Sequence, residues 1–251
     1  MSQPSADRRD IMQTLSQWLE PERFQDYCPN GLQVEGRTDV RRIVSGVTAS
    51  QALIDAAIDA DADLILVHHG YFWKGEDQRI TGIKQARLKK LLTHDVNLVA
   101  YHLPLDDHPE LGNNRQLADV LGLQQAAPLD GLVWHGTLAA PMSPDAFAAH
   151  IGAALNRSPL HVGNGPDQIK TVGWCTGAAQ GYIDKALAAG LDAFISGEIS
   201  EPTTHTAREA GIHYYAAGHH ATERYGVQAL GRALAETFGI EHRFIDRDNP
   251  V

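Results

Sequence analysis

The chain has 251 residues, 43% of them hydrophobic and 21% charged, values that are ordinary for a globular protein and exclude extensive disorder. Its 21 basic and 31 acidic residues give a net charge of −10, which argues against a surface that wraps duplex DNA or docks on an anionic membrane. Two cysteines are too few for a disulfide framework, and we see neither a signal segment nor an apolar run long enough for a membrane span. We therefore expect a cytoplasmic protein. The unusual count is 13 histidines, because histidine is the commonest metal ligand.

The first predicted helix has an apolar stripe over residues 11–19 and stops at Pro21. Strand and helix patterns then alternate. Strands are predicted at 43–47, 64–67 and 96–100, and helices at 51–60 and 84–92. Strands that alternate with helices of this length favour parallel pairing in an α/β sheet.

The same order of elements returns in the second half of the chain. Strands are predicted at 172–175, 193–196 and 213–217, with helices at 180–189 and 202–209. An offset that places Asp55 on Asp184 gives several identities between the halves, which we interpret as an internal duplication. Between the two repeats the patterns predict helices at 111–121 and 145–155 and a strand at 134–138.

We therefore predict an α/β fold of two pseudo-twofold-related halves with mixed, largely parallel sheets. The segment 127–131, Ala-Pro-Leu-Asp-Gly, is the best boundary candidate, which gives a first half of 1–128 and a second of 129–251. We expect the halves to intertwine around a shared site, because ligands gather beyond the carboxyl ends of parallel strands.

Four predicted strands run directly into clusters of histidine and carboxylate residues. These clusters are His68-His69, His102 with Asp106, Glu198, and His219-His220 with Glu223. Imidazole and carboxylate donors without a nearby thiolate suit Zn, Mn, Fe, Co or Ni. Adjacent histidines at a strand end should diverge, which favours two ions over one, and Asp106 and Glu223 are the available bridging carboxylates.

Three of these motifs, His68-His69-Gly70, His102 to Asp106 and Gly218 to Glu223, resemble the Nif-three-like family, whose members are often called GTP cyclohydrolase 1 type 2 homologues. Asn30 to Gly36 resembles the N-terminal signature of that family, and the short bacterial form is the best match in length. The resemblance implies a site for two divalent metal ions whose ligands are His68, His69, Asp106, His219 and Glu223, with Glu223 as the bridge. It also implies a homohexamer.

The function we predict is a metal-dependent hydrolase of a nucleotide-like substrate or another small phosphorylated or cyclic-amide substrate. His102 and Glu198 are the candidates to shuttle protons beside the ligands. The alternative is a non-enzymatic adaptor or metal-handling protein, whose coordination would be closed where a catalytic site keeps an open position. A ring that threads nucleic acid would need a basic inner surface, and Arg41-Arg42 with Lys89-Lys90 are too few to supply one.

Overall fold

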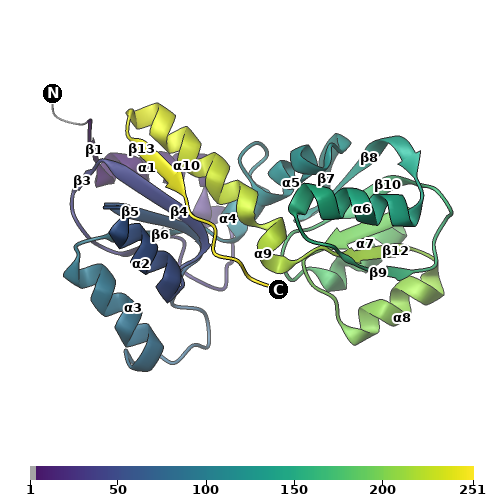
Figure 1. Ribbon diagram of the computed structural model, residues 1–251, viewed down its shortest axis with the longest axis horizontal. Helices are drawn as coiled ribbons and strands as arrows, with labels where there is room; N and C mark the ends of the chain where they lie inside the picture. Colours follow the sequence, from purple (N-terminus) through teal and green to yellow (C-terminus); the bar gives the residue numbers. More distant parts are fainter. Residues whose placement is uncertain (1–3) are drawn as a thin grey trace. The chain divides into compact units, whose positions relative to one another are not determined.

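The computed structural model describes residues 4–251, and their contacts divide the chain into two compact units (Figure 1). The first unit combines the chain up to Gly112 with Gly226–Arg247, and the second combines Asn113–Tyr225 with Asp248–Val251. This division lies earlier than the boundary at 128/129 suggested by the sequence. The segment 127–131 forms the end of one strand and the start of the turn into the next.

The first unit contains one five-stranded sheet, and each of its central strands is followed by a helix (Figure 1). The sheet order is β13-β4-β5-β6-β2, parallel throughout except for the antiparallel edge strand β2. A short antiparallel pair, β1 with β3, lies outside this sheet. The elements are β1 (Ala6–Asp7), α1 (Arg8–Leu19), η1 (Pro21–Arg23), β2 (Gly31–Val34), β3 (Asp39–Val40), β4 (Arg42–Thr48), α2 (Gln51–Asp59), β5 (Leu64–His69), α3 (Gly82–Thr93), β6 (Asn97–Ala100), α4 (Leu103–Asp107), α10 (Arg224–Phe238) and β13 (Glu241–Phe244).

Alternation along the central strands gives this sheet two apolar faces. Leu64 and Leu66 of β5 pack in a cluster with α1 and α10, whereas Ile65 and Val67 pack in another with α2 and α3. Successive side chains of a strand point to opposite faces, so four consecutive buried apolar residues require helices on both sides. The unit is therefore a three-layer sandwich.

The second unit is built in the same way around a six-stranded sheet. Its order is β7-β8-β10-β11-β12-β9, with β10, β11 and β12 parallel and the other pairs antiparallel. One face packs against α5 and α6, and the other against α7 and α8. The elements are α5 (Asn113–Leu121), β7 (Gln124–Asp130), β8 (Val133–Met142), α6 (Pro144–Leu155), β9 (Leu160–Gly163), β10 (Ile169–Trp174), η2 (Gln180–Tyr182), α7 (Ile183–Ala188), β11 (Ala193–Ser196), α8 (Glu201–Ala210), β12 (His213–Ala216) and α9 (His219–Thr222).

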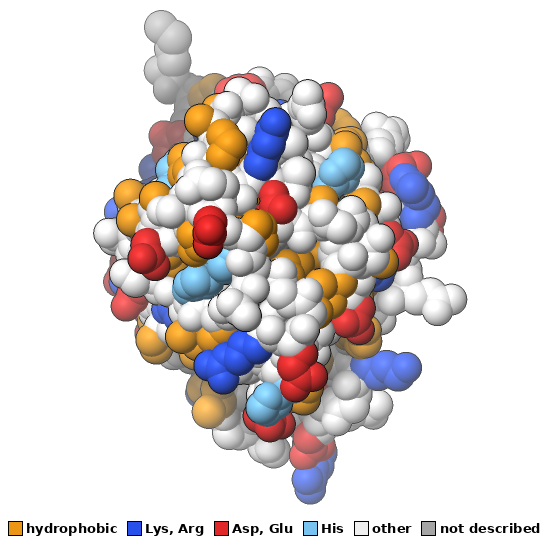
Figure 2. All heavy atoms as spheres, turned by 90° about the vertical axis from the view of Figure 1, so that its right-hand side faces the viewer, with side chains coloured by type: hydrophobic (Ala, Val, Ile, Leu, Met, Phe, Trp, Pro, Cys, Tyr) orange, Lys and Arg blue, Asp and Glu red, His pale blue; other side chains and the backbone are white. Residues whose placement is uncertain are grey.

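The mixed α/β sheets predicted from the sequence are confirmed. The second sheet has more antiparallel pairs than expected, because β7, β8 and β9 extend it on both sides of a parallel centre. Within residues 4–251, no helix is both long and apolar enough to cross a membrane. Figure 2 looks onto the second unit, where acidic and basic side chains are interspersed over the visible face.

Candidate metal centre

In the first unit, β5 ends on His68 and His69, and the chain then leaves the sheet at Gly70. His68 is fully buried and His69 is half-buried. Their ring centroids lie 4.6 Å apart with the planes tilted by 47°, so the two rings are neighbours and do not diverge as alternation along a strand predicted. His69 is held at Nδ1, which lies 3.1 Å from the Thr48 hydroxyl at the end of the adjacent strand β4.

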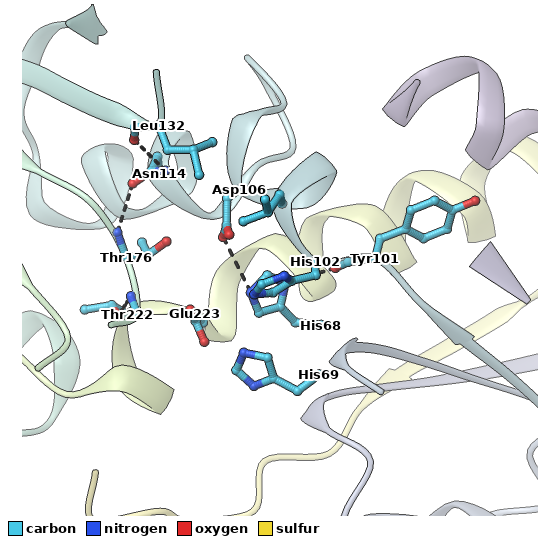
Figure 3. A network of polar contacts seen from close by, with 12 residues as sticks. His68, His69, Tyr101, His102, Asp106, Asn114, Leu132, Thr176, Thr222 and Glu223 are labelled. Carbon is cyan, nitrogen blue, oxygen red and sulfur yellow. Dashed lines mark hydrogen bonds and ion pairs between the residues drawn. The ribbon is translucent and has the colours of Figure 1, made fainter. Parts of the chain in front are cut away.

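The imidazole of His68 is anchored through Nδ1, and its Nε2 faces a carboxylate. Nδ1 donates to the backbone carbonyl of Tyr101 at 2.9 Å, and Nε2 lies 3.5 Å from Oδ1 of Asp106 (Figure 3). A carbonyl oxygen can only accept, so in the neutral ring the lone pair on Nε2 faces the carboxylate. Two electron-pair donors held face to face in a buried place are an arrangement that a cation between them stabilises. The side chains of this unit therefore fit a metal ion.

His102 follows β6, and its ring contacts the carboxylate of Asp26. Nδ1 of His102 lies 2.6 Å from Oδ1 of Asp26, whose other oxygen accepts from Asn30 and from the backbone N–H of Leu103. Burial opposes ionisation of the Asp26 carboxyl, but the hydrogen bonds of His102 and Asn30 outweigh burial and lower its pKa to about 2. Asp26 is thus a carboxylate at neutral pH and holds the ring of His102 in place.

In the second unit, His219 lies between two carboxylates. Its Nδ1 is 2.7 Å from Oε1 of Glu198, and its Nε2 is 3.2 Å from Oε2 of Glu223 one helical turn further on. Burial lowers the pKa of His219, but the hydrogen bond and charge of Glu223, together with those of Glu198, outweigh it and raise the pKa to about 9. Nε2 therefore meets a carboxylate across a position that either a proton or a metal ion can fill.

Glu223 is packed closely beneath the turn that follows β10. Gly177 in this turn has a φ of +68°, and a Cβ there would lie 2.1 Å from Oε1 of Glu223. Asn114 holds the same turn, accepting from the N–H of Thr176 at 3.1 Å and donating to the carbonyl of Leu132 (Figure 3). The turn therefore shapes the space around the carboxylate of a candidate ligand.

The structure groups the predicted ligands within each unit. His68, His69 and Asp106 lie together in the first, and His219 and Glu223 in the second. Glu198, predicted as a proton shuttle, is the hydrogen-bond partner of His219. Asp26 and Asn114 were missed, because each is a single polar residue far along the chain from its partner, and no motif marks them.

Three aromatic residues, Tyr71, Phe72 and Trp73, follow the histidine pair and Gly70. Tyr71 is buried, and its hydroxyl donates to the carbonyl of Ala49 at 2.6 Å. Trp73 packs edge-on against His102, with ring centroids 5.0 Å apart. Phe72 alone is exposed by more than a third. The run therefore covers the histidine cluster of its own unit.

Histidine and carboxylate clusters after parallel strands, repeated in two α/β units, define a class of α/β protein with a candidate metal centre. The model of the Duf34/NIF3 (NGG1p interacting factor 3) family matches residues 6–250, and the chain belongs to this family. The Nif-three-like resemblance is thereby confirmed.

Relatives of high identity support the same assignment. The chain is 60% identical over 246 residues to the GTP cyclohydrolase 1 type 2 homolog of Pseudomonas aeruginosa, covering 96% of this chain and 97% of that protein. The solved structure of protein ybgI, described as of unknown function, is 50% identical with a TM-score of 0.96 over 98% of this chain and 100% of that one. The solved structure of TTHA1606 from Thermus thermophilus is 35% identical with a TM-score of 0.92, again over 98% and 100%.

Proposed function

We propose that the protein is a metal-dependent hydrolase that uses two divalent ions per chain. The observation that carries this proposal is the buried pair of His68 and Asp106, in which a nitrogen lone pair and a carboxylate oxygen are held 3.5 Å apart. The donors are nitrogen and oxygen, which suit Zn, Mn, Fe, Co or Ni. We assign His68, His69, Asp106, His219 and Glu223 as the ligands, on the resemblance of their motifs to the family and on this donor chemistry.

Bound ions of this kind lower the pKa of a coordinated water towards 7 and polarise the bond under attack. The residues of the chain supply orientation. Tyr101 and Thr48 fix the two histidines of the first unit, and Glu198 fixes His219 in the second. Hydrogen bonds to the outer nitrogen of a ligating histidine set its tautomer and strengthen it as a donor.

The substrate we propose is nucleotide-like, or another small phosphorylated or cyclic-amide molecule. The support is the shared name of the relatives, GTP cyclohydrolase 1 type 2 homolog, which names a nucleotide. The excess of acidic residues makes nucleic acid a poor partner. We also propose that the protein forms a hexamer in the cytoplasm. The support is the exposed apolar side chains of Ile80, Ile83 and Leu92 in the first unit, which contacts between subunits would bury.

The experiment is metal analysis of protein purified without tag or chelator, followed by a hydrolysis screen over nucleotides and cyclic amides. We expect bound divalent metal and turnover that His68→Ala abolishes. Protein that binds none of the five metals after reconstitution would contradict the metal centre. Tightly bound metal without any turnover would favour the metal-handling alternative.

A further inference from the structure

The first unit holds a third histidine that the predicted ligand set leaves out. The ring centroid of His102 lies 5.1 Å from that of His68 and 5.8 Å from that of His69 (Figure 3). One nitrogen from each of the three rings lies within 4.8 Å of the others. His102 therefore belongs to the same cluster, although it comes from a different strand end.

All three rings are anchored through Nδ1. The partners are the Tyr101 carbonyl for His68, the Thr48 hydroxyl for His69 and the Asp26 carboxylate for His102. Anchoring at Nδ1 makes Nε2 the nitrogen that can face a metal. A tetrahedral ion with metal–nitrogen bonds of about 2.0–2.1 Å needs ligand nitrogens roughly 3.4 Å apart, which small rotations of these side chains can reach.

Asp26 is built into the unit as a support for His102. Its side chain is only 3% exposed, and it accepts from His102, Asn30 and the backbone of Leu103. Asn30 also accepts from the N–H of His102, so backbone and ring are fixed by the same pair of residues. A carboxylate held in this way behind a histidine is the arrangement that metal proteins use to orient a ligating imidazole.

We propose that His102 offers its Nε2 to the metal centre as a third imidazole of the first unit, with Asp26 as the positioning residue that holds it. This inference rests on the proposed metal centre and extends it by one donor and one supporting carboxylate. It replaces the proton-shuttle role that the sequence suggested for His102.

The test is titration of the full-length apoprotein with Co²⁺ and with Zn²⁺, using visible absorption for Co²⁺ and chelator competition for Zn²⁺. Asp26→Asn should weaken metal affinity by about 10- to 100-fold. His102→Ala and His102→Gln should weaken it at least as much and change the Co²⁺ spectrum. His102→Gln keeps a donor for Asp26, so it separates loss of the ligand from loss of folding.

The matched control is the surface pair of His205 and Glu201, which has the same imidazole–carboxylate contact at 3.0 Å but lies on an exposed helix face. His205→Ala should leave affinity and spectrum unchanged. Parent affinity and parent spectrum in His102→Gln and Asp26→Asn would overturn the inference while leaving the metal centre intact. A parent protein that binds neither ion would overturn both.

Discussion

The two units share one framework and differ in the chemistry at its strand ends. In the first, Ile43 of β4 is opposite Leu64 of β5, and in the second, Val172 of β10 is opposite Ala193 of β11, each pair related by the same offset that superposes Asp55 and Asp184. At the ends of the matching strands, however, His69 in the first unit corresponds to Glu198 in the second.

An acidic residue stabilises the shared framework at the same place in each unit: Asp63, which is buried, and Asp192, which is partly buried. Asp63 accepts from the N–H groups of Arg41 and Arg42, and Asp192 accepts from those of Lys170 and Thr171. The corresponding residues at the strand ends, His69 and Glu198, are not the acceptors of these backbone N–H groups. The comparison teaches that the repeated positions stabilise the sheet, whereas the strand ends have become an imidazole-rich cluster in one unit and a carboxylate-rich cluster in the other.

The largest expected effect is a loss of stability when the acid that supports the shared framework is removed from either unit. Asp63→Ala and Asp192→Ala should each lower the free energy of unfolding by about 2–4 kcal/mol, because two backbone donors lose a charged acceptor. Urea unfolding of the metal-free protein measures this. Asp59→Ala, on the surface of α2, should change stability by no more than about 0.5 kcal/mol. A large loss for one acid and none for the other would contradict the equivalence of the units.

The second prediction concerns the carboxylate cluster of the second unit. Gly177→Ala should displace the Glu223 carboxylate, because the new Cβ would lie 2.1 Å from its oxygen. We expect metal affinity to fall by about tenfold or more, as for loss of a supporting contact. Chelator competition measures the affinity.

A close control is available for this substitution. Gly190 has the same φ of +68°, and a Cβ added there would meet no atom within 4 Å, so Gly190→Ala introduces the same backbone strain without the clash. Gly190→Ala should lose stability and keep its metal affinity. Equal metal affinity in the two variants would show that Gly177 does not shape the position of Glu223.

The smallest expected effect is a change in the pH dependence of stability, and it concerns His242 on the edge strand β13 of the first unit. His242 on β13 bonds to Ser45 at 2.8 Å, and burial, with a smaller effect of Arg232, lowers its pKa to about 4. In the unfolded chain the imidazole of His242 is protonated near pH 6.5, whereas in the folded chain it is protonated only at about pH 4. Stability contributed by neutral His242 is therefore full above pH 6.5 and declines as the pH falls towards 4.

Replacing His242 should make the free energy of unfolding depend less on pH in the acidic range. In His242→Gln, the pH dependence of unfolding between pH 6.5 and 4 should weaken by up to about one proton. Urea unfolding at several pH values in this window, with chelator present, gives the slope. His205→Gln, on the exposed face of α8, is the comparison, and an unchanged slope in His242→Gln would refute the assignment.

The sequence predicted the central strands and their helices because their buried residues form apolar runs on a repeating plan. It did not predict the edge strand β13, whose residues Glu241–Phe244 are all polar except the last. Its place depends on pairing with β4, far earlier in the chain, and on the ion pair of Arg42 with Glu241. Pairing over such a distance leaves no local pattern.

The candidate ligands were predicted from the sequence because they cluster at or shortly after the ends of predicted strands, as His68 and His69 do at the end of β5. Asp26 was invisible, because it lies in a loop 76 residues before His102 and only the tertiary fold brings the two together. The neighbouring position of the His68 and His69 rings was also beyond the sequence, because it depends on contacts with Tyr101 and Thr48.

The most direct test of the proposed centre is metal stoichiometry per chain, by elemental analysis of the parent and of four variants at Asp106, Glu223, His219 and His220. The account predicts two ions in the parent and at most one in Glu223→Ala, because Glu223, as the proposed bridge, would serve both ions. In Asp106→Ala it predicts one tightly held and one weakly held ion, because Asp106 would be a ligand of one ion alone. His220→Ala should keep both ions, and His219→Ala should not. Two tightly held ions in Glu223→Ala, or a loss confined to His220→Ala, would contradict it.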